Sequence, residues 1–314
     1  MNLLDLYNAR IADANSLNEV SQMHIVFANS LTPTEILFLH GNLFAGSKHK
    51  APKLSPLCRF TLPQLQEAGR LWIDQHRAML AEIGKPRIEL YRRYELHDAV
   101  VLFSTDRKTP RRNLVISLTG ANQRLMMPIS GYLQNFDGKT TDILYVRDSS
   151  RQGYRGGIPK LADDMVEIGP ALTELIDLTP YRQIVTVGVS AGGLPGLVMA
   201  LRLGLDATLV CGGSSPERGQ FDETGGPKLA GRLREWRQAS LHTRVVVGYG
   251  AQDDKDESAA ADIAHCVAGA EVERIALDGV EVKHNFIYKL SATGLLPAFM
   301  SDRLGLTDED RAGG

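Results

Sequence analysis

The apolar positions of the chain follow two different spacings, and the change between them falls near residue 87. Before this point apolar residues recur every three or four positions, most clearly over 62–80, which predicts an amphipathic helix. Thr32 followed by Pro33 and Glu35 has the form of a helix N-cap with proline in the first turn. We therefore expect residues 1–86 to form an N-terminal helical region.

From residue 87 onward, short runs rich in valine and isoleucine alternate with helical stretches. The predicted strands are 88–94, 99–104, 114–119, 142–147, 183–188, 207–211, 244–249 and 272–277. The predicted helices among them are 160–177, 193–203 and 256–268. Runs that are apolar on both faces suit buried parallel strands, and alternation of strand and helix indicates a parallel sheet covered on both sides. The expected fold class is α/β, with a mostly parallel central sheet and flanking helices in a domain spanning 87–314.

A long polar insertion separates two of the predicted strands, at about 214–242. It contains a predicted helix at 228–238, and a connection of this length is usually functional or mobile, so a lid is one interpretation. Its basic residues are Arg218, Lys228, Arg232, Arg234 and Arg237. With few large apolar residues beside them, these charges favour a soluble substrate that is anionic or glycan-linked. A solvated helix face explains the same pattern equally well.

The clearest chemical motif is Gly188-Val189-Ser190-Ala191-Gly192, a G-x-S-x-G sequence between a predicted strand and a predicted helix. The glycines allow strand and helix to approach closely, and the sharp turn projects the serine hydroxyl above the sheet. The turn also places the Ala191 N–H at a helix N-terminus, where it can stabilise an oxyanion formed at Ser190. Ser190 is therefore the candidate nucleophile. The competing interpretations are a tight turn with an idle serine and a phosphate-binding loop, and the absence of G-x-G-x-x-G or G-K-[ST] here disfavours the second.

A serine nucleophile needs a base, which in this strand–turn–helix architecture follows the acid along the chain. His284 is the candidate, because it alone among the eight histidines lies beyond the last predicted strand. The acid should follow the predicted strand 244–249, and two residues qualify. Asp253 has the usual reach from the strand and is placed slightly ahead. Asp256 is the alternative, although its position at the start of the next helix also suits a structural N-cap.

The second oxyanion donor should come from the loop after the predicted strand 114–119. Gly120 permits close approach of the backbone there, and the N–H of Ala121 or of Asn122 is the candidate donor. His40-Gly41 resembles the opening of such a loop, but it precedes the sheet and follows a helical pattern, so it is interpreted as structural.

Taken together, the strand–GVSAGG–helix segment at 183–203, the acid loop at 244–256 and the His284 loop resemble the α/β-hydrolase superfamily over about residues 87–300. The resemblance implies acyl chemistry with water or an alcohol as acceptor. Two features depart from the usual pattern, namely the Thr119-Gly120-Ala121 opening in place of His-Gly and the N-terminal 85 residues. The resemblance thus implies a serine hydrolase of esters or thioesters. An acyltransferase of the same mechanism and a non-catalytic binding or scaffold protein are the alternatives.

Composition says more about the compartment and the partners of the protein than about its chemistry. The 314 residues include 43% hydrophobic and 23% charged residues, with a net charge of −2, so no overall field favours nucleic acid. Three scattered cysteines form no C-x-x-C pair, which disfavours a zinc site or a disulfide framework. No stretch of 18 apolar residues predicts a membrane span, and the N-terminus has no signal-peptide pattern. We expect a cytoplasmic enzyme with a small-molecule or glycan-linked acyl substrate, no cofactor and no metal; the sequence leaves the oligomeric state open.

Overall fold

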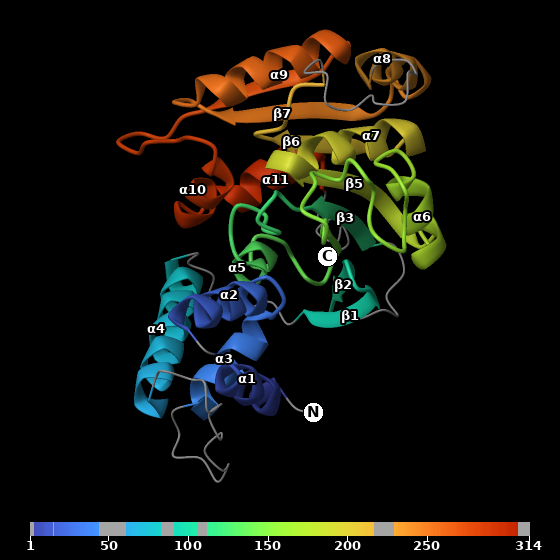
Figure 1. Cartoon of the computed structure of the whole chain (residues 1–314). Coiled ribbons are helices and arrows are strands. Elements are labelled where there is room, and N and C mark those ends of the chain that lie inside the picture. Colours follow the sequence, from blue (N-terminus) through green and yellow to red (C-terminus); the bar gives the residue numbers. More distant parts are fainter. Residues whose placement is uncertain are drawn as a thin grey trace, which may run out of the picture. The chain divides into compact units, whose positions relative to one another are not determined.

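The computed structural model describes residues 3–14, 16–43, 61–82, 91–105, 112–216 and 229–306. The chain divides into two compact units (Figure 1). The first holds Met1–Tyr91 and Pro128–Asn135, and the second holds Arg92–Met127 and Phe136–Gly314. The predicted domain boundary at 86/87 lies outside the described residues, so it stays a prediction.

The described part of the first unit is helical. Its helices are α1 (Leu3–Ala12), α2 (Leu17–Ala28), α3 (Pro33–Leu43), α4 (Leu62–Glu82) and α5 (Ile129–Leu133). The predicted N-cap is confirmed as a capping box, in which Thr32 N donates to Glu35 Oε2 at 2.8 Å and Glu35 N donates to Thr32 Oγ1 at 3.3 Å. The helical pattern predicted before His40 is likewise confirmed by α3, which extends through His40 to Leu43.

An aromatic cluster occupies the core of the first unit. The His24 ring stacks on Trp72 with centroids 4.6 Å apart, and the Tyr7 hydroxyl lies 2.9 Å from His24 Nε2. All three residues are buried. Burial, with a smaller contribution from the nearby His76, lowers the pKa of His24 from 6.5 to about 4. His24 is therefore neutral at physiological pH.

The second unit contains an eight-stranded sheet of order β1-β2-β4-β3-β5-β6-β7-β8. The strands are β1 (Arg92–His97), β2 (Val100–Ser104), β3 (Arg112–Leu118), β4 (Thr141–Val146), β5 (Tyr181–Val189), β6 (Ala207–Cys211), β7 (Arg244–Gly250) and β8 (Glu271–Ile275). β2 pairs antiparallel with both β1 and β4, and every other pairing is parallel. The predicted α/β class with a mostly parallel sheet is confirmed.

Helices cover both faces of this sheet. They are α6 (Ile168–Leu175), α7 (Gly193–Leu203), α8 (Leu229–Ala239), α9 (Asp254–Cys266), α10 (Phe286–Ala292) and α11 (Leu296–Leu304). Alternate residues of the parallel strands, such as Leu114 and Val247, point to one face and pack under α6 to α9. Figure 1 shows α10 and α11 on the other side of β6 and β7 from α9, where Gly248 leaves space for the Phe286 ring.

The predicted helix 160–177 is wrong over its first half. Residues 160–167 form turns, and helix begins only at Ile168. The reason is local: Asp164 Oδ1 accepts the N–H groups of Val166 and Glu167, which gives the backbone an alternative to the helical ladder. Lys160 also has a positive φ of 64°, which a helix does not tolerate. The predicted strand 88–94 is displaced, because β1 begins at Arg92 and residues 88–90 lie outside the described part.

Candidate active site

Ser190 occupies the sharp turn between β5 and α7. Its φ is +51°, in the left-handed region that residues with a Cβ rarely adopt, and a short 3₁₀ turn (Ser190–Gly192) leads into the helix. Backbone strain of this kind costs on the order of 1–3 kcal/mol and concentrates at functional sites. The predicted strand–turn–helix arrangement is therefore present, with the serine at the strained position.

The two glycines of the motif are required by close backbone contacts. A Cβ added to Gly188 would lie 2.2 Å from the Gly192 oxygen, and one added to Gly192 would lie 2.4 Å from the Leu118 oxygen. Both distances are far below van der Waals contact. Any side chain at either position would push β5, α7 and β3 apart and displace Ser190.

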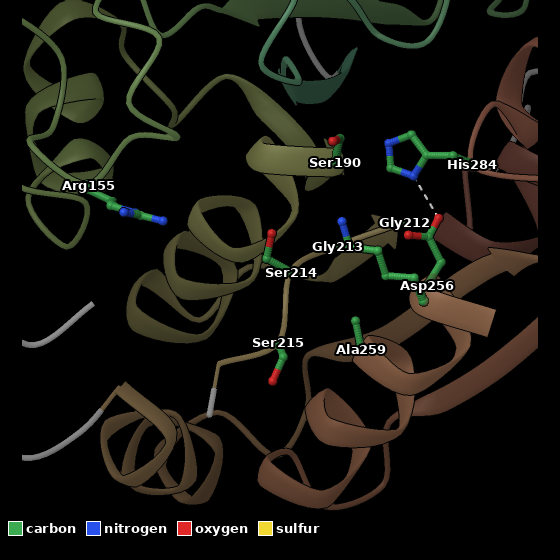
Figure 2. A pocket seen from close by; sticks show the side chains of 10 residues that line it. Arg155, Ser190, Gly212, Gly213, Ser214, Ser215, Asp256, Ala259 and His284 are labelled. Carbon is green, nitrogen blue, oxygen red and sulfur yellow. Dashed lines mark hydrogen bonds and ion pairs between the residues drawn. The ribbon is translucent and has the colours of Figure 1, made fainter. Parts of the chain in front are cut away.

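A cavity of about 270 Å³ opens beside Ser190. Its lining includes Ser190, Asp256 and His284 together with Arg155, Lys255 and Ser214 (Figure 2). Residues from five separate segments of the second unit thus meet at one site, near the carboxyl ends of the parallel strands.

His284 is bound to a carboxylate, and that carboxylate belongs to Asp256. Nδ1 of His284 lies 2.7 Å from Asp256 Oδ2, with the Asp256 side chain 8% exposed and that of His284 46% exposed. Because an ionised carboxylate only accepts hydrogen bonds, the Nδ1 proton points to Asp256 and Nε2 is left as the basic nitrogen. This hydrogen bond raises the pKa of His284 above its ordinary value, against the opposing effect of partial burial.

Asp253 has the role that the sequence had suggested for Asp256. Its Oδ1 accepts the N–H of Asp256 at 3.1 Å, so Asp253 is the N-cap of α9. The weighting that placed Asp253 ahead of Asp256 as the partner of His284 is reversed by this geometry. The physical reason is that α9 begins at Asp254, two residues before its predicted start, which places Asp256 in the first turn.

Gly212 makes room for the pair formed by Asp256 and His284. It follows β6 with a φ of +57°, and a Cβ there would lie 2.7 Å from Asp256 Oδ2 and 2.9 Å from His284 Nδ1. No pattern in the sequence singled out Gly212. The only sequence signal that could have found it is a glycine directly after a buried strand, at the same end of the sheet as the loops that carry Asp256 and His284.

The second imidazole nitrogen faces Ser190. Figure 2 shows the ring nitrogen that Asp256 does not bind on the side of the ring turned toward the Ser190 side chain. No hydrogen bond joins the two side chains in the described part of the chain. Hydrogen bonds between a nucleophile and its base are often long until the substrate is bound, so this arrangement is compatible with proton transfer.

The candidate oxyanion donors lie on two segments. Ala191 follows Ser190 at the start of the turn into α7, where the first N–H groups have no partner within the helix. Ala121 and Asn122 lie in a turn closed by hydrogen bonds from Gly120 N to Arg124 O (2.9 Å) and from Gln123 N to Gly120 O (2.8 Å). These bonds use neither the Ala121 nor the Asn122 N–H. A Cβ on Gly120 would lie 3.1 Å from Ser190 Cβ, so this turn is adjacent to the nucleophile.

The arginines of the polar insertion do not line the cavity where the structure describes them. Arg237 is buried and donates to the carbonyls of Ala268, Ser240 and Thr243, so it joins α8 to its surroundings. Arg232 lies over the Trp236 ring at 4.9 Å. Arg218 and Lys228 fall outside the described residues, as does the whole segment 217–228, so the interpretation of the insertion at 214–242 as a lid stays a prediction. The cations that sequence reasoning missed at the cavity are Arg155 and Lys255.

Asp253, Asp256 and His284 each offer one ligand atom within 4.8 Å of the others, which makes them the candidate group for a metal ion. These side chains already have hydrogen-bond partners. Asp256 Oδ2 is bonded to His284, and Asp253 Oδ1 caps α9. This pairing is the one that orients an imidazole base, so we assign no metal to the group. Among the described helices, none is long and apolar enough to cross a membrane.

The order of these parts along the sheet defines the fold type. Ser190 follows β5, Asp256 follows β7 and His284 follows β8, which is the order of the corresponding positions in an α/β-hydrolase fold. No protein-family model matches the sequence, and no curated protein matches it. The chain has an α/β-hydrolase fold by its own topology.

Several solved structures share part of this architecture. The capsule O-acetyltransferase of Neisseria meningitidis serogroup A is 11% identical with a TM-score of 0.47, covering 72% of this chain and 99% of that one. Est1E of Butyrivibrio proteoclasticus is 12% identical with a TM-score of 0.45, over 68% and 99% of the two chains. A carboxylesterase of Bacillus subtilis is 11% identical with a TM-score of 0.45, over 74% and 98%. Similarities this distant transfer no activity to the chain.

Proposed function

We propose that the chain is a serine hydrolase that cleaves a carboxylic ester or thioester through an acyl-enzyme on Ser190. The observation that carries this proposal is the shared cavity, into which a strained serine and a carboxylate-bound histidine both open. A nucleophile, a base and an orienting acid within one cavity are the parts that acyl transfer requires.

The proposed reaction begins when Ser190 Oγ attacks the carbonyl carbon and His284 Nε2 takes its proton. The tetrahedral oxyanion is stabilised by the Ala191 N–H and by that of Ala121 or Asn122. Asp256 stabilises the imidazolium without itself taking the proton. The imidazolium then protonates the departing alcohol or thiol, leaving the acyl group on Ser190. Water, activated by the same histidine, releases the acid in a second round.

The same geometry serves an acyltransferase if an alcohol or a glycan hydroxyl replaces water in the second step. A non-catalytic binding protein is the alternative of a different class. It would use the fold without needing the strained Ser190 or the hydrogen bond between His284 and Asp256, so both features weigh against it.

Two measurements test the proposal together. The purified chain should be labelled by a fluorophosphonate probe at Ser190 and should hydrolyse 4-nitrophenyl acetate. Ser190→Ala should lose both properties. Ser214→Ala, which changes another serine of the same cavity, should keep the label. A wild-type chain that is neither labelled nor active on short esters would point to the non-catalytic alternative. Supplying alcohol or sugar acceptors in the assay separates transfer from hydrolysis.

A further inference from the structure

The turn that carries the candidate donors Ala121 and Asn122 has the form of a three-residue hairpin loop. Gly120 N donates to Arg124 O at 2.9 Å, and Gln123 N donates to Gly120 O at 2.8 Å. The last residue of such a loop takes a left-handed conformation, which glycine adopts without strain. Here that residue is Gln123, with a φ of +56°. The turn therefore keeps its shape against the backbone preference of one of its own residues.

The strained residue is held from outside the turn, as such a conformation requires. The Tyr145 hydroxyl donates to Gln123 O at 2.7 Å, and Gln123 Nε2 donates to Asp148 O at 3.3 Å. Tyr145 belongs to β4, and Asp148 lies directly beyond its end. The end of β4 thus fixes the turn at the position where its backbone is strained.

Tyr145 reaches this turn because of the register of the sheet. β3 and β4 are parallel with Ser117 opposite Tyr145, and the turn begins at Gly120, just beyond β3. The Tyr145 side chain is buried, and its ring packs edge-on against Phe103 of β2 with centroids 6.2 Å apart. Burial raises the pKa of Tyr145 above its ordinary value, so the hydroxyl keeps its proton and acts as the donor.

The same turn lies against the proposed nucleophile. A Cβ added to Gly120 would lie 3.1 Å from Ser190 Cβ and 3.5 Å from Val189 O. An oxyanion donor must lie about 2.7–3.1 Å from the oxygen that it stabilises, so a small shift of the turn would move the Ala121 or Asn122 N–H out of reach. The shape of this turn is therefore a requirement of the proposed reaction.

We infer that Tyr145 is a positioning residue: through the carbonyl of Gln123, its hydroxyl holds the turn in the shape that directs the Ala121 or Asn122 N–H to the oxyanion. This inference rests on the proposed function, because it concerns the second donor of the same reaction. The oxyanion forms both when Ser190 is acylated and when the acyl group is released. Loss of the Tyr145 hydroxyl therefore lowers kcat more than it changes KM.

Two esters that differ in one atom test this role on the full chain. The developing charge falls on oxygen in 4-nitrophenyl acetate and on sulfur, a weak hydrogen-bond acceptor, in O-(4-nitrophenyl) thionoacetate. A misplaced donor slows mainly the oxygen ester, whereas damage to Ser190 or His284 slows both. Both are assayed with wild type, Tyr145→Phe and the control Tyr181→Phe. The Tyr181 hydroxyl bonds to Asp142 Oδ2 at 3.2 Å, near the opposite end of β4.

We expect Tyr145→Phe to lower kcat for 4-nitrophenyl acetate by about 10- to 100-fold, somewhat less than the roughly 10²–10³-fold loss when a donor itself is removed. KM should change little, and the ratio of kcat/KM for the oxygen ester to that for the thionoester should fall. Tyr181→Phe should match wild type. Replacing Tyr145 by 4-aminophenylalanine, which returns an N–H donor to the same place, should recover part of the lost rate.

An unchanged kcat in Tyr145→Phe, or equal losses on the two esters, would overturn the inference and leave the serine mechanism intact. If Tyr145→Phe does not fold, Gln123→Ala takes its place. That change removes the bond to Asp148 O from a half-buried residue and should lower the same ratio. An unchanged ratio in Gln123→Ala would then overturn the inference.

Fluorophosphonate labelling distinguishes failure of the inference from failure of the proposed function. A wild-type chain that is neither labelled nor active on either ester would overturn both. If the wild type is labelled but hydrolyses neither ester, the rate of labelling is the measurement, because attack on phosphorus also places negative charge on an oxygen beside the donors. That rate should fall in Tyr145→Phe and stay unchanged in Tyr181→Phe; equal rates in the two variants would overturn the inference.

Discussion

Gln252 and Val282 are joined by two hydrogen bonds in opposite directions. Gln252 N donates to Val282 O at 2.9 Å, and Val282 N donates to Gln252 Oε1 at 2.8 Å. Gln252 lies in the loop after β7, which leads to Asp256, and Val282 lies two residues before His284. The pair therefore ties the segment that carries Asp256, the proposed acid, to the segment that carries His284, the proposed base.

Removing the side-chain half of this tie should reduce activity more than stability. We expect Gln252→Ala to lower kcat about tenfold or more, because small misplacements of a catalytic group are costly. The loss of one hydrogen bond should cost only about 1 kcal/mol of unfolding free energy. Gln183→Ala is the matched control, since the Gln183 side chain likewise makes one hydrogen bond to the backbone, donating to Leu304 O, away from the cavity. Equal losses of kcat in the two variants would show that Gln252 has no positioning role.

Measurements of kcat, and of kcat/KM as a function of pH, can identify the acid. Asp256→Asn should lower kcat on the order of 10²–10⁴-fold, by favouring the wrong imidazole tautomer. It should also move the rising limb of the kcat/KM profile to lower pH. In the wild type, Asp256 raises the pKa of His284, so the neutral base appears only at higher pH. Asp253→Asn should retain activity and stability, because asparagine is as good an N-cap as aspartate. A large loss in Asp253→Asn alone would return the role to Asp253.

Gly212 offers a way to disable the site with little effect on the fold. Gly212→Ala should abolish most activity, because its Cβ would occupy the space between Asp256 and His284. The left-handed backbone adds a stability cost of roughly 1–2 kcal/mol. Gly279→Ala carries the same backbone penalty, at a φ of +70°, with nothing within 4 Å of the new Cβ. Comparing ester hydrolysis and thermal unfolding of the two variants distinguishes the effect of the steric clash with Asp256 and His284 from the effect of the backbone strain. Full activity in Gly212→Ala would mean that the pair of Asp256 and His284 is not needed.

The first unit should lose stability in acid. His24 is held neutral by burial with a pKa of about 4, whereas in the unfolded chain it titrates near 6.5. Between these values the unfolded state binds more protons, so stability is full above pH 6.5 and falls as the pH drops to 4. A shift of this size corresponds to on the order of 3 kcal/mol. The groups that face His24 are Tyr7, Trp72 and His76.

Fluorescence of Trp72 can follow this transition, since Trp236 is the only other tryptophan and Trp236→Phe removes its signal. In that background, denaturant unfolding at pH 7 and pH 4.5 should differ strongly. His24→Gln should flatten the difference even if it lowers stability at both values, and the exposed His265→Gln should leave it unchanged. A pH dependence that survives in His24→Gln would assign the effect to another group.

The sequence predicted the parts of the fold and site that local patterns determine. Valine- and isoleucine-rich runs located the sheet, and the glycines around Ser190 located the sharp turn between β5 and α7, because both depend on neighbouring residues. His284, which lines the same cavity as Ser190, was singled out by its place after the last predicted strand. The order of preference between Asp253 and Asp256 differs from the observed contact of Asp256 with His284, because it depended on where α9 begins, a shift of two residues that periodicity does not resolve.

What the sequence did not predict depends on contacts between distant segments. Arg155 lines the cavity next to Tyr154, whose hydroxyl bonds to Thr119 and Val146, and no local pattern predicts these contacts. Residues 160–167, later in the same connection, had been interpreted as helix. The short helix α5 was missed for a similar reason. Its five residues contain little more than one turn, and its grouping with the first unit is a matter of tertiary packing.

The hydroxyl of Tyr154 links two segments that protein engineering would treat as separate. One side chain holds the strand end that precedes the Gly120 turn and also anchors the loop that ends in Arg155. Changes in residues 148–155 will therefore be transmitted to the turn that carries the donors proposed for the transition state. A grafted loop would have to bring its own tyrosine, or an equivalent group that donates to Val146 O and accepts from Thr119 Oγ1, to leave that turn in place.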